Sequence, residues 1–169
     1  MKTDLLNSYR FNLRYAHELV HDVEDDMMTI SPAKGLENHP AFTLGHLASG
    51  AAMTSKYLGG PYNFSSEWEA LFKRNGPGDP RTPEKNLSLY PTKTELLQDL
   101  SSQHLLVEKL IDELDENAFS KPVKWRYTVH MPTLLDLLTF MCITHESMHL
   151  SQLAAWRRAM DLPSALAKL

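Results

Sequence analysis

Two histidines near the C-terminal end of the chain have the spacing of a metal-binding pair. His145 and His149 are four residues apart, so in a helix they lie one turn apart on the same face and can reach one metal ion. They fall within an apolar stripe between Met141 and Trp156, where two imidazoles need partners for their ring nitrogens. A metal ion satisfies both lone pairs together. We therefore predict that this pair binds a divalent metal ion.

The segment around the pair also matches a zinc-peptidase signature. Residues 145–149 read His-Glu-Ser-Met-His, which fits H-E-x-x-H, a motif whose glutamate is the general base and whose third ligand lies downstream. After His149 the chain contains no histidine or glutamate, and its only acidic residue there, Asp161, follows the helix. The pattern argues against a peptidase, and a third ligand must come from upstream.

Two upstream histidines are candidates for that third ligand. His46 lies in the middle of an expected helix, on the same face as Phe42, and His104 lies on the apolar stripe of another helix. Either would give a three-histidine site with an open coordination position. Position alone does not choose between them. A second pair with four-residue spacing, His17 and His21, falls beside an apolar stripe, and we interpret it as a surface pair.

Other polar residues near the pair have weaker signals. Gln152 lies one turn beyond His149, where it either donates a hydrogen bond to a bound ligand or only orders the bundle. Glu146 points about 100° away from the ligand face, so it either supports a ligand from behind or is an exposed helix residue. We expect Cys142 to be a small buried apolar residue. We expect Arg157 and Arg158 to be solvated. His39 and His130 are expected to lie in connections, and Trp156 and Tyr57 to pack in the core.

Apolar residues at steps of three and four predict long helices that would position these side chains. The first is predicted over residues 3–28. The second runs over residues 40–58, with Asn38 as its N-cap. The third begins at Thr92, where Glu95 completes a capping box, and extends to about residue 114. The fourth runs over residues 133–160. Together these predict an all-α four-helix bundle.

The connections between these helices are long. Residues 61–91 are irregular, with a short helix around residues 68–72 and a loop at residues 75–80, and a stretch of this length in a small domain is often functional. Residues 120–131 are expected to form an extended connection.

Composition narrows the class of protein. The chain has 169 residues, a formal charge of −4 and one cysteine, which fits one domain over residues 1–169 with no internal disulfide. The mild acidity argues against nucleic acid as a partner. We find no signal-peptide core and no run long enough to span a membrane. These features favour a soluble, cytoplasmic protein.

Two segments make the chain resemble the DinB-like superfamily of DinB/YfiT-type bundles. The first contains His46 within the sequence Leu-Gly-His-Leu at residues 44–47, and the second is the H-E-x-x-H segment followed by Gln152. The resemblance covers nearly the whole chain. Two positions depart from the family pattern, since Phe42 stands where relatives often have Trp and Ser151 where Gly often precedes the Gln.

The resemblance implies an up-down-down-up bundle with a long crossover connection, often a homodimer. It also implies a divalent metal, commonly nickel, zinc or iron, held by His46, His145 and His149, which favours His46 over His104. Members with known activity include transferases and isomerases that use a low-molecular-weight thiol. We therefore expect a metal-dependent thiol S-transferase acting on a small electrophile. The alternatives are a metal-dependent hydrolase and a non-catalytic, stress-response metal-binding bundle, because ligands alone do not define a reaction.

Overall fold

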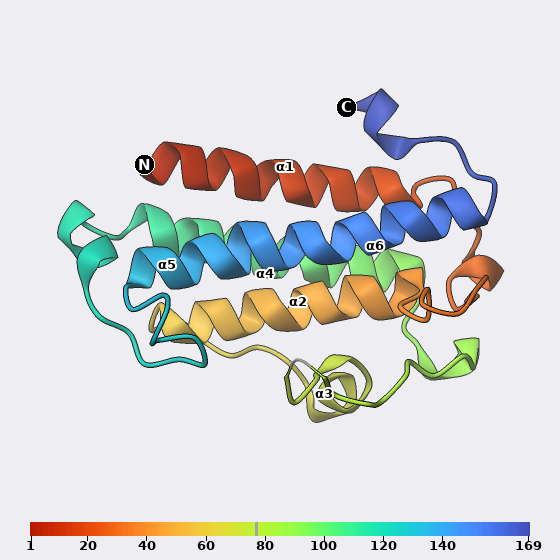
Figure 1. Ribbon diagram of the computed structural model, residues 1–169, viewed down its shortest axis with the longest axis horizontal. Coiled ribbons are helices and arrows are strands. Elements are labelled where there is room, and N and C mark those ends of the chain that lie inside the picture. Colours follow the sequence, from red (N-terminus) through yellow and green to blue (C-terminus); the bar gives the residue numbers. More distant parts are fainter. Residues whose placement is uncertain (77) are drawn as a thin grey trace.

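The computed structural model describes residues 1–76 and 78–169, which form a bundle of helices packed side by side (Figure 1). The long helices are α1 (Lys2–Val20), α2 (Pro40–Tyr57), α4 (Lys93–Asp112) and a continuous C-terminal helix made of α5 (Leu134–Thr139), a π-helical turn (Phe140–His145) and α6 (Glu146–Ala159). The short α3 (Ser66–Phe72) lies beside α2, outside the bundle (Figure 1). No strand occurs in these two ranges, which confirms the all-α class. Among the described helices, none is both long and apolar enough to cross a membrane.

Side-chain caps define where most of the helices begin. The predicted capping box of Thr92 and Glu95 is present at the start of α4, and an equivalent box of Thr133 and Asp136 begins α5. The predicted cap of α2 is wrong by one residue, because the Nδ1 atom of His39, and not Asn38, accepts the Phe42 N–H at 3.2 Å. An imidazole with its proton on the other nitrogen is an acceptor that satisfies a free helix N–H as a carboxylate would.

The first helix is shorter than predicted. It ends at Val20, and the chain turns where the Val23 N–H donates to the Val20 carbonyl. Val23 and Met28 nevertheless stay buried after the turn, so their apolar spacing mimicked a continuing helix. The predicted loop at residues 75–80 is non-helical where it is described, and Pro77 lies outside the described residues. The connection at residues 120–131 is extended around Pro122, which forms an isolated antiparallel bridge with Thr133, and it bends and turns over residues 125–130.

The turn after α1 is tied to α6 by a buried arginine, which corrects the expectation that Arg157 is solvated. Arg157 is 2% exposed, and its guanidinium donates to both carboxylate oxygens of Asp22, at 2.5 and 3.0 Å. It also donates to the carbonyls of Leu19 and Pro163. Arg158 is exposed, as predicted. The fully bonded guanidinium therefore joins the end of α1, α6 and the C-terminal segment.

Replacing Asp22 with asparagine is expected to lower the free energy of unfolding by about 2 kcal/mol at pH 7, because Arg157 loses its charged partner. Hydrogen bonding to Arg157 lowers the pKa of Asp22 to about 2. The wild-type stabilisation is therefore fully present above the unfolded pKa, about 4, and is lost as the pH falls towards 2. Urea denaturation of both proteins at neutral and acidic pH measures the difference. A difference that does not shrink in acid would contradict this assignment.

The apolar core is divided into two clusters by a polar layer. The cluster at one end includes Leu19, Val20, Phe42, Leu96, Leu100 and Trp156, and the cluster at the other includes Leu5, Leu6, Val107, Ile111, Leu137 and Leu138. Between them, Asn12 of α1, His104 of α4 and Glu146 of α6 are all buried. This layer lies at the level where the C-terminal helix changes from π-helical to α-helical geometry. The bundle therefore places its polar groups around one turn of that helix.

Candidate metal centre

Three histidines from two helices converge beside the polar layer. His46 lies in the middle of α2, His145 ends the π-helical turn and His149 lies in the first turn of α6. One ring nitrogen of each lies within 4.8 Å of the others, and all three side chains are partly exposed. The ring centroids are 4.6–5.3 Å apart. The structure thus brings together the three histidines named as metal ligands from the sequence, and His104 is not among them.

The orientation of His46 is set by α3. Its Nδ1 lies 2.8 Å from the Phe72 carbonyl oxygen, so Nδ1–H donates and the lone pair of Nε2 is left for a ligand. Gly45 makes this contact possible, because a Cβ atom at that position would lie 2.4 Å from the Phe72 ring. The glycine before His46 therefore lets the Phe72 ring rest directly on α2 and places its carbonyl oxygen at the imidazole. Nothing in the sequence identified Phe72 as the partner.

Gly45→Ala is expected to lower the free energy of unfolding by about 1–3 kcal/mol, because the added methyl group meets the Phe72 ring and overpacks the contact. Gly50→Ala is the matched control in the same helix. A Cβ there would lie at an ordinary 3.4 Å from the His145 ring, and alanine gains up to about 1 kcal/mol of helix propensity. Urea denaturation of the chelator-treated proteins measures the free energy of unfolding of each variant. Equal stabilities of the two variants would refute this function of Gly45.

Burial keeps the three imidazoles neutral. It lowers the pKa of His46, and it lowers the pKa of His145 to about 4 and of His149 to about 3, with the neighbouring rings adding to the shift. Neutral imidazoles carry the lone pairs that a divalent ion needs. The buried Nδ1 of His149 has no hydrogen-bond partner among the described residues. Three neutral imidazoles, one of which has an unpartnered ring nitrogen, fit a divalent metal ion with an open position.

Aromatic rings flank the cluster on two sides. The Phe42 ring stacks on His46, with centroids 5.4 Å apart and an angle of 15° between the planes. The Phe140 ring lies 6.3 Å from that of His145 and packs against Tyr127, which belongs to the connection before α5. Aromatic rings from α2 and from the π-helical turn therefore lie against two of the three histidines.

Gln152 lies at the exposed edge of the cluster. Its Oε1 accepts a hydrogen bond from the Asn38 side chain at 2.9 Å, which leaves the amide N–H groups of Gln152 as donors. This orientation is compatible with a hydrogen bond from Gln152 to a ligand beside His149.

Glu146 is buried and faces away from the histidine cluster, which rules out the exposed alternative. Its Oε1 lies 2.8 Å from Nε2 of His104, and both side chains are nearly inaccessible. The Tyr9 ring stacks on His104 with centroids 3.9 Å apart. Burial raises the pKa of Glu146, and His104 partly opposes this rise. Glu146 therefore belongs to the polar layer and not to the position of a peptidase general base.

The π-helical turn before His145 has a polar partner on another helix. The side-chain amide of Asn12 donates to the Cys142 carbonyl at 3.1 Å and approaches the Ile143 carbonyl at 3.5 Å. Extra donors of this kind stabilise a π-turn, whose widened geometry is frequent at functional sites. Cys142 itself is buried, as expected, and burial raises the pKa of its thiol.

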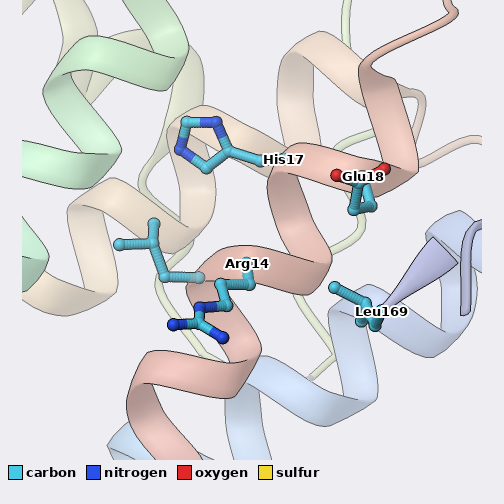
Figure 2. A pocket seen from close by; sticks show the side chains of 5 residues that line it. Arg14, His17, Glu18 and Leu169 are labelled. Carbon is cyan, nitrogen blue, oxygen red and sulfur yellow. The ribbon is translucent and has the colours of Figure 1, made fainter.

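The remaining candidates lie outside the cluster. His17 forms a hydrogen bond with Ser101 and lines an open pocket of about 330 Å³ between α1 and the C-terminal Leu169, together with Arg14 and Glu18 (Figure 2). None of the three clustered histidines lines this pocket. Trp156 is buried in the core, whereas His21, Tyr57 and His130 are exposed.

The fold and the site together define the class of this protein, which is a helical bundle with a three-histidine cluster held by two of its helices. A family model of the DinB superfamily matches residues 8–153, a range that includes all three histidines. The chain therefore belongs to the DinB superfamily, whose members typically bind metal. Searches of the curated proteins and of the solved structures found no match.

Proposed function

We propose that His46, His145 and His149 bind one divalent metal ion, which would be nickel, zinc or iron, and that the protein transfers a low-molecular-weight thiol to a small electrophile. The convergence of three neutral ring nitrogens within 4.8 Å carries the metal site. A divalent ion held there supplies a Lewis acid that lowers the pKa of a thiol at its open position. Membership of the DinB superfamily supports the thiol transferase.

The residues of the chain would divide the remaining work. The Phe72 carbonyl holds the His46 ring in one tautomer, and Phe42 and Phe140 restrict water around the cluster. The Gln152 amide, oriented by Asn38, donates to the bound ligand. In the transfer, a bond forms between the thiol sulfur and the electrophilic carbon, the leaving group departs with its electron pair, and the thiol proton passes to solvent.

The test is turnover of a thiol with an alkyl chloride by the metal-loaded protein. We expect a rate above the uncatalysed reaction that disappears in His149→Ala while circular dichroism shows an unchanged helix content. Hydrolysis of ester substrates by the loaded protein, without thiol transfer, would indicate the hydrolase instead. A metal that raises the melting temperature but supports no turnover would indicate a non-catalytic bundle.

We also propose that the chain forms a homodimer and that its helices follow an up-down-down-up order. The long connection over residues 58–92 between α2 and α4 is compatible with that order, and the exposed Tyr57 on α2 supports a further contact surface. Light scattering at micromolar concentration tests the dimer, and a monomeric mass would exclude it.

A further inference from the structure

An arginine that the sequence did not single out lies beside the histidine cluster. Arg74 follows α3 by two residues, and its guanidinium carbon lies 4.3 Å from the centroid of the Phe42 ring. The same Phe42 ring stacks on His46. The loop after α3 therefore brings a cation to one wall of the candidate metal centre.

The guanidinium of Arg74 has no acidic partner among the described residues. Its only hydrogen bonds there run from Nη1 to the carbonyls of Leu71 and Lys73, at 3.3 and 3.4 Å. The nearby carboxylate of Asp79 is already occupied by Arg81, which donates to it from Nε and Nη2. Nε and Nη2 of Arg74 therefore make no hydrogen bond to the described residues. A half-buried cation whose nearby carboxylate, Asp79, is bonded to another arginine gains from binding an anion.

Arg74 and Arg126 meet at this loop without an ion-pair partner among the described residues, although the whole chain carries a formal charge of −4. Lys73 and Arg81 also lie nearby, but each is paired with a carboxylate, Lys73 with Glu69 at 3.0 Å and Arg81 with Asp79 at 2.5 Å. Arg126 reaches in from the connection before α5 to donate to the Asn75 carbonyl at 2.5 Å. Burial and the charge of Arg81 lower the pKa of Arg74, and Asp79 and Tyr90 oppose this shift, but a guanidinium remains charged at neutral pH. The two arginines that have no carboxylate partner among the described residues therefore favour an anion on this side of the cluster.

We propose that Arg74 binds a carboxylate of the substrate and so makes the site specific for small carboxylate-bearing molecules whose reacting atom lies at the three histidines. A planar guanidinium pairs with a carboxylate through two parallel hydrogen bonds, which fixes orientation as well as charge. The inference rests on the proposed function, because it assumes that the reacting centre is at the histidine cluster. The carboxylate belongs either to the thiol or to the electrophile.

The first test measures thiol binding without turnover. N-acetylcysteine and N-acetylcysteamine differ only by a carboxylate, and each is titrated into cobalt-loaded protein while the absorption spectrum of the metal is followed. If the carboxylate is on the thiol, wild-type protein binds N-acetylcysteine about 10- to 100-fold more tightly than N-acetylcysteamine, as expected for a charged hydrogen-bonded pair. Arg74→Gln abolishes this preference, Arg74→Lys retains part of it, and the exposed Arg158→Gln serves as the matched control that retains all of it.

The second test measures the electrophile. Turnover of chloroacetate and of its neutral analogue chloroacetamide is compared with 2-mercaptoethanol as the thiol; a carbon–sulfur bond forms and chloride leaves. A preference for chloroacetate that depends on Arg74 places the carboxylate on the electrophile. Cobalt content equal to wild type confirms that each variant is intact. The proposal is overturned if neither pair shows a preference that depends on Arg74. Binding of N-acetylcysteine that depends on Arg74, without turnover of either chloride, would refute the transferase and retain the carboxylate site.

Discussion

Replacing any one of His46, His145 and His149 with alanine is expected to weaken zinc or nickel binding by about 100-fold. Structural zinc sites with four ligands bind with about 10–16 kcal/mol, which is about 3 kcal/mol for each ligand if the ligands contribute equally. Two remaining imidazoles hold the ion far less well, because solvent must replace the missing nitrogen. Isothermal titration of chelator-treated protein measures the affinity of each variant.

The control for this experiment is the second pair of histidines on α1. His17→Ala and His21→Ala remove imidazoles with the same four-residue spacing, but His17 bonds to Ser101 and His21 is exposed, and neither belongs to the cluster. Both variants should bind metal as the wild type does. Wild-type affinity in a variant of the cluster, or a large loss in either control, would refute the assignment of the ligands.

Breaking the buried pair of Glu146 and His104 is expected to cost about 3–5 kcal/mol of the free energy of unfolding, because each partner left alone is a buried polar group without compensation. The two side chains lie 2.8 Å apart in the polar layer, with Tyr9 stacked on the imidazole. Glu146→Leu and His104→Leu should each show this loss. The double variant should lose less than the sum of the two, because it leaves neither polar partner behind.

Denaturation in the presence of a chelator measures the four proteins of this cycle without a contribution from bound metal. Glu146→Gln serves as the conservative variant if a leucine variant fails to fold, since its amide retains an acceptor for His104. Losses that add without coupling would show that Glu146 and His104 do not stabilise one another.

The long helices could be predicted from the sequence because their signals are local. Stripes at steps of three and four, together with the capping box of Thr92 and Glu95, depend on residues within one or two turns. The spacing of His145 and His149 is local in the same way. The choice of His46 over His104 needed the family resemblance, since both lie on apolar faces, and the structure explains the difference because His104 is paired with Glu146.

The cap of α2 and the end of α1 are local errors, whereas other features that the sequence did not reveal have partners distant in the sequence. The π-helical turn before His145 is bonded by Asn12, 130 residues away from Cys142 along the chain. Arg157 is buried because Asp22 and the Leu19 carbonyl of α1 satisfy it. Arg74 lies in a connection without periodicity, where no pattern places a side chain next to α2. Contacts of this kind are set by tertiary packing and leave no regular signal in the sequence.

The most direct measurement of the central claim is anomalous diffraction from a crystal of the protein loaded with zinc or nickel. We predict a single strong peak between α2 and the C-terminal helix, about 2.0–2.1 Å from one ring nitrogen of each of His46, His145 and His149. At least one further position on the ion should be open to solvent or ligand. A peak at His17 and His21, or a crystal of metal-loaded protein without a peak at the three histidines, would contradict the account.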